Sequence, residues 1–226
     1  MIRLVLFDID GTLVHTGGAG TLAFSQTFHH IFGLKDGVER MKFAGRTDVS
    51  LVREFLQIHN LPASAENLRR FFENYVFWLE KIVGQSRGGE CQGITPFLRG
   101  LLALPQPPML GLLTGNIQLG AEIKLRRFGL WKFFEFGGFA DDSDDRDQIA
   151  VAALARARRV LDACLDPQEI VVIGDTPFDV RCGKFIGAKT LAVATGGSPY
   201  ADLLPQGADW TVKDLMQISA REICPR

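Results

Sequence analysis

The stretch IRLVLFDIDGT, residues 2–12, sets the expectation for the fold, because a nearly continuous apolar run ends abruptly in two aspartates and a glycine. Such a run, without polar alternation, is typical of a strand buried on both faces of a parallel sheet. Similar runs occupy 109–113 and 170–173, with weaker candidates at 133–136 and 190–193. Helical periodicity fills 117–128, 147–163 and 177–186. This alternation predicts an α/β fold with a doubly wound, mainly parallel sheet of the Rossmann-like kind.

About a hundred residues between the first two strands carry helical patterns and no strand signal. Candidate helices lie at 18–32, 48–59, 65–83 and 94–104. A single crossover helix needs only about a dozen residues, so this interval predicts an inserted all-helical subdomain. Glycines at 17–18 and within 84–93 are its expected hinges. We therefore expect a core domain of 1–14 and 91–226 and a helical cap of 15–90.

Composition narrows the class of protein. The 226 residues are 46% hydrophobic and 23% charged, with a net charge of -1, which indicates a globular chain without the basic excess of a nucleic-acid binder. No apolar run approaches the ~20 residues of a membrane span. The cysteines are far apart and form no Cys-x-x-Cys pair, which favours free thiols in a reducing compartment: Cys91, Cys164, Cys182 and Cys224. We expect a soluble cytoplasmic protein, monomeric or homodimeric.

Polar residues follow each of the strongest predicted strands. The motifs are Asp8-Ile9-Asp10-Gly11-Thr12, Thr114-Gly115-Asn116, and Gly174-Asp175-Thr176-Pro177-Phe178-Asp179. Ligands of open parallel sheets bind beyond the carboxyl ends of the strands. The motifs should therefore converge on a single site.

The spacing of the first motif suits phosphoryl transfer. In extended backbone Asp8 and Asp10 point to the same side, about 6.5 Å apart along the chain. Asp8 is placed to attack phosphorus and form an acyl phosphate. Asp10 is placed to protonate the leaving oxygen and then to deprotonate the attacking water. Gly11 permits a sharp turn of the backbone. This turn exposes the backbone amides of Gly11 and Thr12 to phosphate oxygens.

A cation is needed where these carboxylates meet a phosphate. Asp175 and Asp8 offer the hard oxygen ligands that suit Mg²⁺, and Asp179 is a further ligand or orients the others. Thr114, Gly115 and Asn116 supply neutral donors for the phosphoryl oxygens. Arg146 is the best candidate for a fixed cation. The alternatives for that role are Lys124, Arg126 and Arg127.

Together these motifs resemble the four ordered motifs of the haloacid dehalogenase superfamily, over residues 4–197, and 15–90 resembles its helical cap. The chain is most similar to the phosphoglycolate phosphatase-like branch. The resemblance implies that Asp8 is the nucleophile and Asp10 the acid/base. It also implies Mg²⁺ held by Asp8, the Asp10 carbonyl and Asp175. Many members carry lysine as the third motif, where this chain offers Arg146.

The predicted activity is hydrolysis of a small-molecule phosphate monoester, phosphoglycolate-like or a sugar phosphate, with no nucleic-acid or membrane partner. A phosphomutase would retain the same constellation. A dehalogenase would need neither Asp10 nor a metal. A receiver-type signalling protein would place an acidic pair before its phospho-acceptor, whereas Asp8 is the first acidic residue here. A binding protein with a relic of the site would not need the full set of groups.

The segment Gly45-Arg46-Thr47-Asp48 stands out within the insert. Thr47 or Asp48 suits the N-cap of a helix. A second interpretation is that this cap segment dips into the site and that Arg46 binds an anionic part of the substrate. Changing Arg46 to alanine would then impair turnover of anionic substrates.

Overall fold

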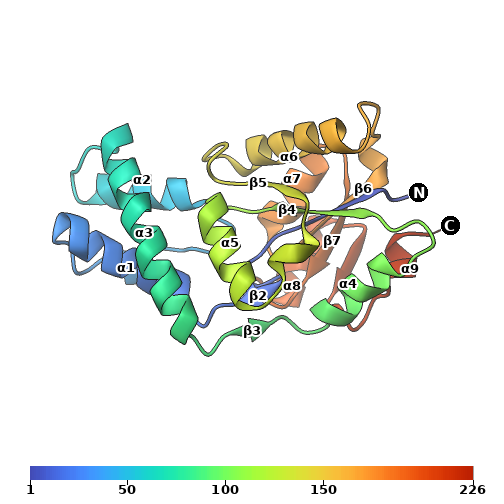
Figure 1. The fold of residues 1–226 in the computed structure, drawn as a ribbon, viewed down its shortest axis with the longest axis horizontal. Helices are drawn as coiled ribbons and strands as arrows, with labels where there is room; N and C mark the ends of the chain where they lie inside the picture. Colours follow the sequence, from blue (N-terminus) through green and yellow to red (C-terminus); the bar gives the residue numbers. More distant parts are fainter. Residues whose placement is uncertain (226) are drawn as a thin grey trace.

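The protein is described by a computed structural model that covers residues 1–225. A six-stranded sheet with the order β5-β4-β1-β6-β7-β8 forms the centre of its larger part (Figure 1). All neighbouring strands of this sheet run parallel, which confirms the predicted fold class. The strands are β1 (Leu4–Phe7), β4 (Met109–Leu113), β5 (Phe136–Gly138), β6 (Ile170–Gly174), β7 (Lys189–Val193) and β8 (Trp210–Val212).

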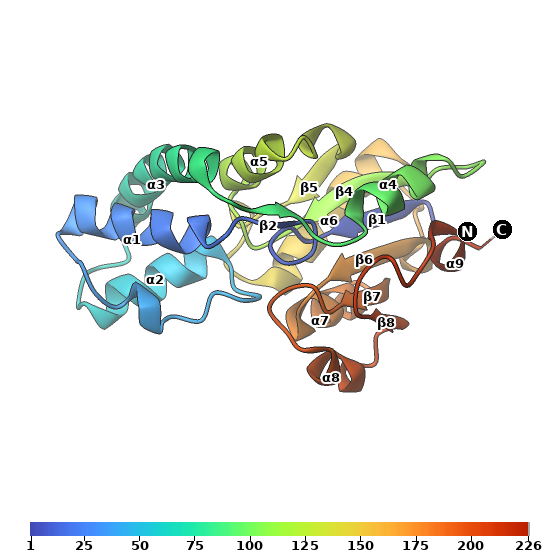
Figure 2. The ribbon, with the colours of Figure 1, turned by 90° about the horizontal axis from the view of Figure 1, so that it is seen from below.

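Helices cover both faces of the sheet (Figure 2). Val5 and Phe7 of β1 belong to a hydrophobic cluster shared with α4, α5 and α9. The alternate residues Leu4 and Leu6 belong to a second cluster, shared with α6 and α7. β1 is therefore buried on both sides, as its unbroken apolar run predicts. The helices are α4 (Ile94–Leu102), α5 (Gln118–Arg127), α6 (Arg146–Val160), α7 (Pro177–Phe185) and α9 (Ala220–Ile223).

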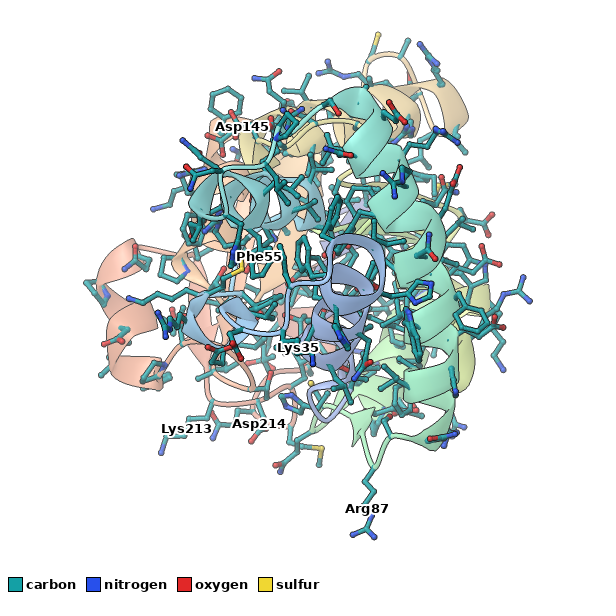
Figure 3. The ribbon with its side chains drawn as sticks, turned by 90° about the vertical axis from the view of Figure 1, so that its left-hand side faces the viewer. Lys35, Phe55, Arg87, Asp145, Lys213 and Asp214 are labelled. Carbon is teal, nitrogen blue, oxygen red and sulfur yellow. The ribbon has the colours of Figure 1, made fainter. Side chains whose placement is uncertain are left out.

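The helical insert lies at the end of the molecule opposite both termini (Figure 1). It consists of α1 (Ala19–Phe32), η1 (Val38–Arg40), α2 (Asp48–Ile58) and α3 (Ala65–Gln85). The Thr47 hydroxyl caps α2 by accepting from Ser50 N, and the Ser64 hydroxyl caps α3 by accepting from Asn67 N. Phe55 of α2 lies among the side chains enclosed by these helices (Figure 3). The ring centroids of Phe55 and Phe28 are 3.8 Å apart. Aromatic packing thus gives the insert a core of its own.

The two chain segments that lead into and out of the insert lie side by side. They form an antiparallel ribbon of β2 (Val14–His15) and β3 (Gly89–Glu90). Next to this ribbon, Gly17 and Gly18 adopt positive φ angles of 63° and 81°. This arrangement supports the division into a 15–90 cap and a core of 1–14 and 91–226, which stays a prediction.

Several predicted elements differ from the structure. The strand expected at 133–136 is wrong: Trp131–Phe133 forms the short helix η2, and the strand is β5, shifted to Phe136–Gly138. A Cβ on Gly138 would lie 2.5 Å from the Ile149 carbonyl oxygen. Glycine is needed there because α6 passes so close, and this contact is invisible in a hydrophobicity pattern.

The helix expected at 94–104 lies within the predicted core segment of 91–226 and ends two residues earlier than expected. It is α4, and its apolar side chains join the core cluster beneath β1. The sequence also did not predict the edge strand β8. Short elements complete the described chain: η3 (Pro167–Glu169), α8 (Tyr200–Leu203) and η4 (Leu204–Gln206).

Across residues 1–225 the helices are too short or too polar for any of them to span a bilayer. The four cysteines are all free thiols, and Cys164 is exposed.

Candidate active site

The sheet order brings the three predicted motifs together. β1 lies between β4 and β6, and Phe7 is in register with both Leu112 and Ile173. The residues that follow these strands therefore emerge side by side at the carboxyl edge, where a cavity of about 320 Å³ opens beneath the insert. Its lining includes Asp8, Asp10, Gly11, Thr114, Gly115, Asn116, Arg146 and Asp175.

A buried acidic cluster forms the floor of this cavity. Side-chain oxygens of Asp8, Asp175 and Asp179 lie within 4.8 Å of one another. Each of these residues is less than a tenth exposed. Arg146, the first residue of α6, is equally buried; it is in contact with Asp179 and lies 3.6 Å from Asp8 Oδ1. The Arg146 guanidinium is thus a single positive charge beside a cluster of three carboxylates.

Burial and mutual repulsion dominate the electrostatics of this cluster. Burial raises the pKa of Asp8 to about 7, with a further rise from Asp179 that Arg146 partly offsets. Burial, Asp179 and Asp8 raise the pKa of Asp175 to about 8, against hydrogen bonds from Gly197 N and Thr12. The raised pKa values mean that a further positive charge near Asp8 and Asp175 would favour ionisation of both carboxyl groups.

A cluster of this composition fits a divalent cation. Mg²⁺ favours a few carboxylate oxygens with its remaining positions free for water and phosphate. Asp8 and Asp175 meet that requirement. Asp179 is more committed, because one of its oxygens faces Arg146 while the other accepts from Thr176 N at 2.9 Å and from the Thr176 hydroxyl at 2.7 Å. It is therefore better placed to orient Arg146 than to be a full ligand.

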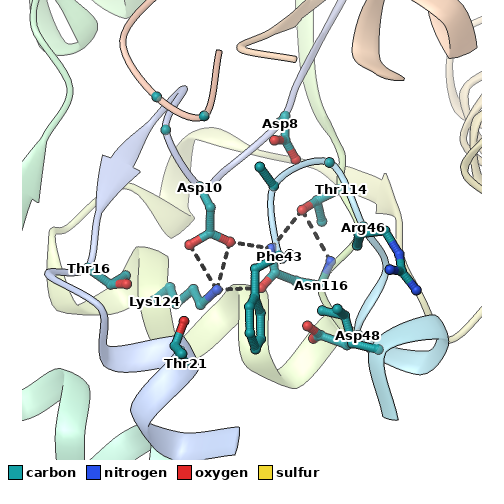
Figure 4. A pocket seen from close by; sticks show the side chains of 18 of the residues that line it. Asp8, Asp10, Thr16, Thr21, Phe43, Arg46, Asp48, Thr114, Asn116 and Lys124 are labelled. Atoms are coloured by element: carbon teal, nitrogen blue, oxygen red, sulfur yellow. Dashed lines mark hydrogen bonds and ion pairs between the residues drawn. The ribbon is translucent and has the colours of Figure 1, made fainter. Parts of the chain in front are cut away.

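A second polar network holds Asp10 (Figure 4). Its carboxylate accepts hydrogen bonds from Lys124 Nζ at 2.7 and 2.9 Å and from Asn116 Nδ2 at 2.8 Å. Lys124 also donates to Asn116 Oδ1 at 2.6 Å, and Asn116 donates to Thr114 Oγ1 at 2.8 Å. Asn116 is thus occupied in orienting Asp10. Since Thr114 Oγ1 serves as the acceptor, its own proton is left to donate into the cavity.

The turn after β1 is tightly packed against Asp175. Gly11 has a φ of +83°, and a Cβ there would lie 2.6 Å from Asp175 Oδ2. The Thr12 hydroxyl donates to Asp175 Oδ1 at 3.3 Å, and Thr12 is absent from the cavity lining. Its predicted contact with phosphate is not favoured by this geometry, which instead makes Thr12 an orienting partner of Asp175. Gly11 lines the cavity as expected.

The insert closes over the site through the segment 43–48. Asp48 N donates to Gly115 O at 2.7 Å, and Asp48 Oδ2 accepts from Ile117 N at 2.9 Å. Burial raises the pKa of Asp48 to about 7, although Lys124 and the Ile117 amide oppose this rise. Arg46 also lines the cavity, but its guanidinium pairs with Glu54 at 2.7 Å and donates to Ser50 at 3.3 Å. The expected contact of Arg46 with an anionic substrate group is therefore not favoured.

Sequence reasoning missed several residues of the site. Lys124 appeared only as an alternative cation, although Gly120 and Lys124 follow Asn116 at four-residue steps, the spacing of one helix face. The glycines after β7, Gly196 and Gly197, also line the cavity. They follow a strand at its carboxyl end and could have been found by the rule that located Asp8. Nothing in the sequence indicated that Asp48 binds the amide of Ile117.

Comparison with known proteins agrees with this geometry. The family model described as haloacid dehalogenase-like hydrolase matches residues 5–193, so the chain belongs to this family. The predicted resemblance and the prediction of an enzyme of this hydrolase class are thereby confirmed. Pyrophosphatase PpaX of Bacillus pumilus is 25% identical over 97% of this chain and 95% of its own length.

Solved structures share the fold. CbbY of Rhodobacter sphaeroides in complex with xylulose-(1,5)bisphosphate superposes with a TM-score of 0.76 at 17% identity, over 95% of each chain. A hydrolase from Pseudomonas syringae gives a TM-score of 0.74 at 18% identity, over 96% of this chain and 95% of its own. At these identities the likeness establishes the fold alone.

Proposed function

We propose that this protein is a Mg²⁺-dependent phosphatase that hydrolyses a small-molecule phosphate monoester through an aspartyl phosphate on Asp8. The observation that carries the proposal is the meeting of Asp8, Asp175 and Arg146 in one buried cluster, with Asp10 facing the same cavity. Nucleophile, proton donor and charge-stabilising groups are the parts that phosphoryl transfer requires. Relatives named as a probable phosphatase and as a pyrophosphatase support an activity that releases phosphate.

The chemistry of the chain's own residues follows in two displacements. An oxygen of Asp8 forms a bond to phosphorus as the bond from phosphorus to the leaving oxygen breaks, and Asp10 gives that oxygen a proton. Water then attacks phosphorus while Asp10 takes its proton, and the bond to Asp8 breaks to release inorganic phosphate. Lys124 and Asn116 hold the Asp10 carboxylate for both steps. Thr114 donates to a phosphoryl oxygen.

Asp8, Asp175 and the Asp10 carbonyl would hold Mg²⁺, with Asp179 beside them. When bound, the ion supplies positive charge that lets the carboxylates and the phosphate dianion share one site. Arg146 adds a fixed cation, which arginine retains at any working pH. The same positive charge would lower the raised pKa values of Asp8 and Asp175.

The substrate is small. A cavity of about 320 Å³ lies at the lower end of the range for small-molecule sites, and phosphoglycolate-like compounds and sugar phosphates fit that size. Opening of the insert about the β2–β3 ribbon would admit the substrate, and closure would exclude bulk water. The free thiols favour a reducing, cytoplasmic environment.

The proposal is tested by following phosphate release from p-nitrophenyl phosphate with and without Mg²⁺, in the wild type and in Asp8→Asn. Asp162→Asn is the matched control, because Asp162 is half-exposed and pairs with Arg3 away from the cavity. We expect steady turnover only when both Mg²⁺ and Asp8 are present, and full turnover in the control.

Two results would contradict the proposal. Full turnover of Asp8→Asn would remove the nucleophile from the mechanism. A single phosphoryl group that stays bound to the wild type would instead indicate a receiver-type protein.

A further inference from the structure

The cations around the cavity are already paired with carboxylates. Arg146 faces Asp8 and Asp179, and Lys124 Nζ spans both oxygens of Asp10. Arg46 is paired with Glu54. The one other basic side chain among the described residues of the lining is His15, which is exposed at the rim. Apart from His15 at the rim, every basic side chain of the lining is therefore already paired with a carboxylate.

The wall opposite the aspartate cluster is built by the insert and has a different character. Phe24, Phe43, Leu51 and Tyr75 give it apolar surface, and the ring centroids of Phe24 and Phe43 are 5.4 Å apart. Asp48 belongs to the same cavity lining (Figure 4). Its Oδ2 is held by Ile117 N. An apolar wall with a few convergent polar groups is suited to a compact organic ligand.

Several polar atoms in this wall have no partner within residues 1–225. Asp48 Oδ1 and the hydroxyl groups of Thr16, Thr21 and Tyr75 line the cavity without making a hydrogen bond to the described protein. Thr16 and Tyr75 are buried. Because these residues line the cavity, their polar groups are available to hydrogen-bond with a bound ligand. A carboxylate oxygen accepts hydrogen bonds only, and it repels a second anion.

We infer that the substrate is the phosphate monoester of an uncharged, hydroxylated alcohol, of the polyol or sugar type. Asp48 Oδ1 accepts a hydrogen bond from a hydroxyl of the alcohol, and Thr16, Thr21 and Tyr75 meet its remaining polar groups. The carbon skeleton lies against Phe24 and Phe43. This inference rests on the proposed phosphatase function. It assigns Asp48 as the specificity-determining residue, which disfavours substrates with a second phosphate or a carboxylate near the reacting phosphorus.

Matched substrate pairs test the inference with the wild-type enzyme and Mg²⁺ at pH 8, above the pKa of about 7 to which burial raises Asp48. One pair is 2-hydroxyethyl phosphate and 2-phosphoglycolate, which differ only in a hydroxymethyl against a carboxylate. The second is glycerol 3-phosphate and 3-phosphoglycerate, and inorganic pyrophosphate is assayed beside them. We expect kcat/KM to favour each uncharged partner by at least about tenfold, since like charges in a desolvated site repel strongly. Equal or reversed preference would overturn the inference.

The variant Asp48→Asn isolates the residue. Asparagine still accepts from Ile117 N but carries no charge, so the preference for the uncharged partner should fall several-fold. Asp144→Asn is the control, because Asp144 pairs with Arg53 outside the cavity, and its preference should equal that of the wild type. An unchanged preference in Asp48→Asn would remove Asp48 from substrate selection.

Turnover of p-nitrophenyl phosphate separates the two proposals. If this substrate is hydrolysed but the carboxylate partners are preferred, the inference alone fails. If it is not hydrolysed and no member of either pair is turned over, the phosphatase function itself fails.

Discussion

Replacing Asp8 with asparagine should abolish turnover and yet stabilise the metal-free protein at alkaline pH. The carboxylate is 6% exposed and lies beside Asp179 and Asp175. Its pKa rises from 3.8 to about 7, chiefly through burial. Asparagine has a similar shape and no charge, and Arg146 keeps its contact with Asp179.

The sign follows from proton binding. Between pH 4 and 7 the folded protein holds a proton on Asp8 that the unfolded chain has released, so the free energy of unfolding falls as the pH rises through this window. At 1.36 kcal/mol per pH unit, a rise from 3.8 to about 7 corresponds to a loss of about 4 kcal/mol above pH 7. Relaxation of the coupled carboxylates reduces this value, so Asp8→Asn should exceed the wild type by about 2–4 kcal/mol at pH 8.

Urea unfolding in EDTA, followed by tryptophan fluorescence from pH 4.5 to 8, measures this difference. We expect the advantage of Asp8→Asn to grow with pH and to be smallest at pH 4.5, while Asp162→Asn follows the wild type throughout. The reasoning would be refuted if Asp8→Asn were less stable than the wild type at pH 8, or if the difference did not vary with pH.

Three further predictions concern the metal, the lysine and the turn. Mg²⁺ at 100 times its Kd should raise the free energy of unfolding of the wild type by about 2.7 kcal/mol at pH 8. The variant Asp175→Asn should need at least ~10-fold more Mg²⁺ for half-maximal activity. An unchanged Mg²⁺ midpoint would contradict the role of Asp175 as a ligand. Lys124→Met should lower kcat about 100-fold with a smaller change in KM, because Asp10 loses the cation that orients it. A kcat within threefold of the wild type, measured on protein with unaltered circular dichroism, would show that Lys124 is dispensable. Gly11→Ala should cost about 2 kcal/mol of stability, because Gly11 has a positive φ and a Cβ there would lie close to Asp175. Gly84→Ala in α3 should stabilise the protein slightly, because a Cβ there meets nothing within 4 Å. Equal melting temperatures for these variants would contradict this account of the turn.

Much of the site could be predicted because its residues directly follow buried strands. Phe7 precedes Asp8, Leu113 precedes Thr114 and Gly174 precedes Asp175. An apolar run that stops at a polar residue marks both the strand and its end, and parallel strands place their carboxyl ends on one edge. The rule works for these elements because the information is local in the chain.

The same reasoning was less successful where contacts are long-range. Lys124 reaches Asp10 across 114 positions of sequence, and Thr12 reaches Asp175 across 163. Arg46 was expected to face the substrate, but Glu54, one to two turns along α2, provides its partner. Pairing of a charged side chain depends on which neighbours the fold supplies, and several candidates satisfy the sequence equally well.

By itself the sequence determined the α/β class, the position of the helical insert and the aspartates that end the central strands, since periodicity and strand-end residues are properties of short segments. Only the tertiary structure decided which cations are paired with carboxylates. In this molecule Arg46, Lys124 and Arg146 each meet a carboxylate, while Asp48 lines the cavity with only its Oδ2 held by Ile117 N. The substrate selection that we infer depends on that balance of charge, which arises from the packing of the insert against the sheet and which no single segment contains.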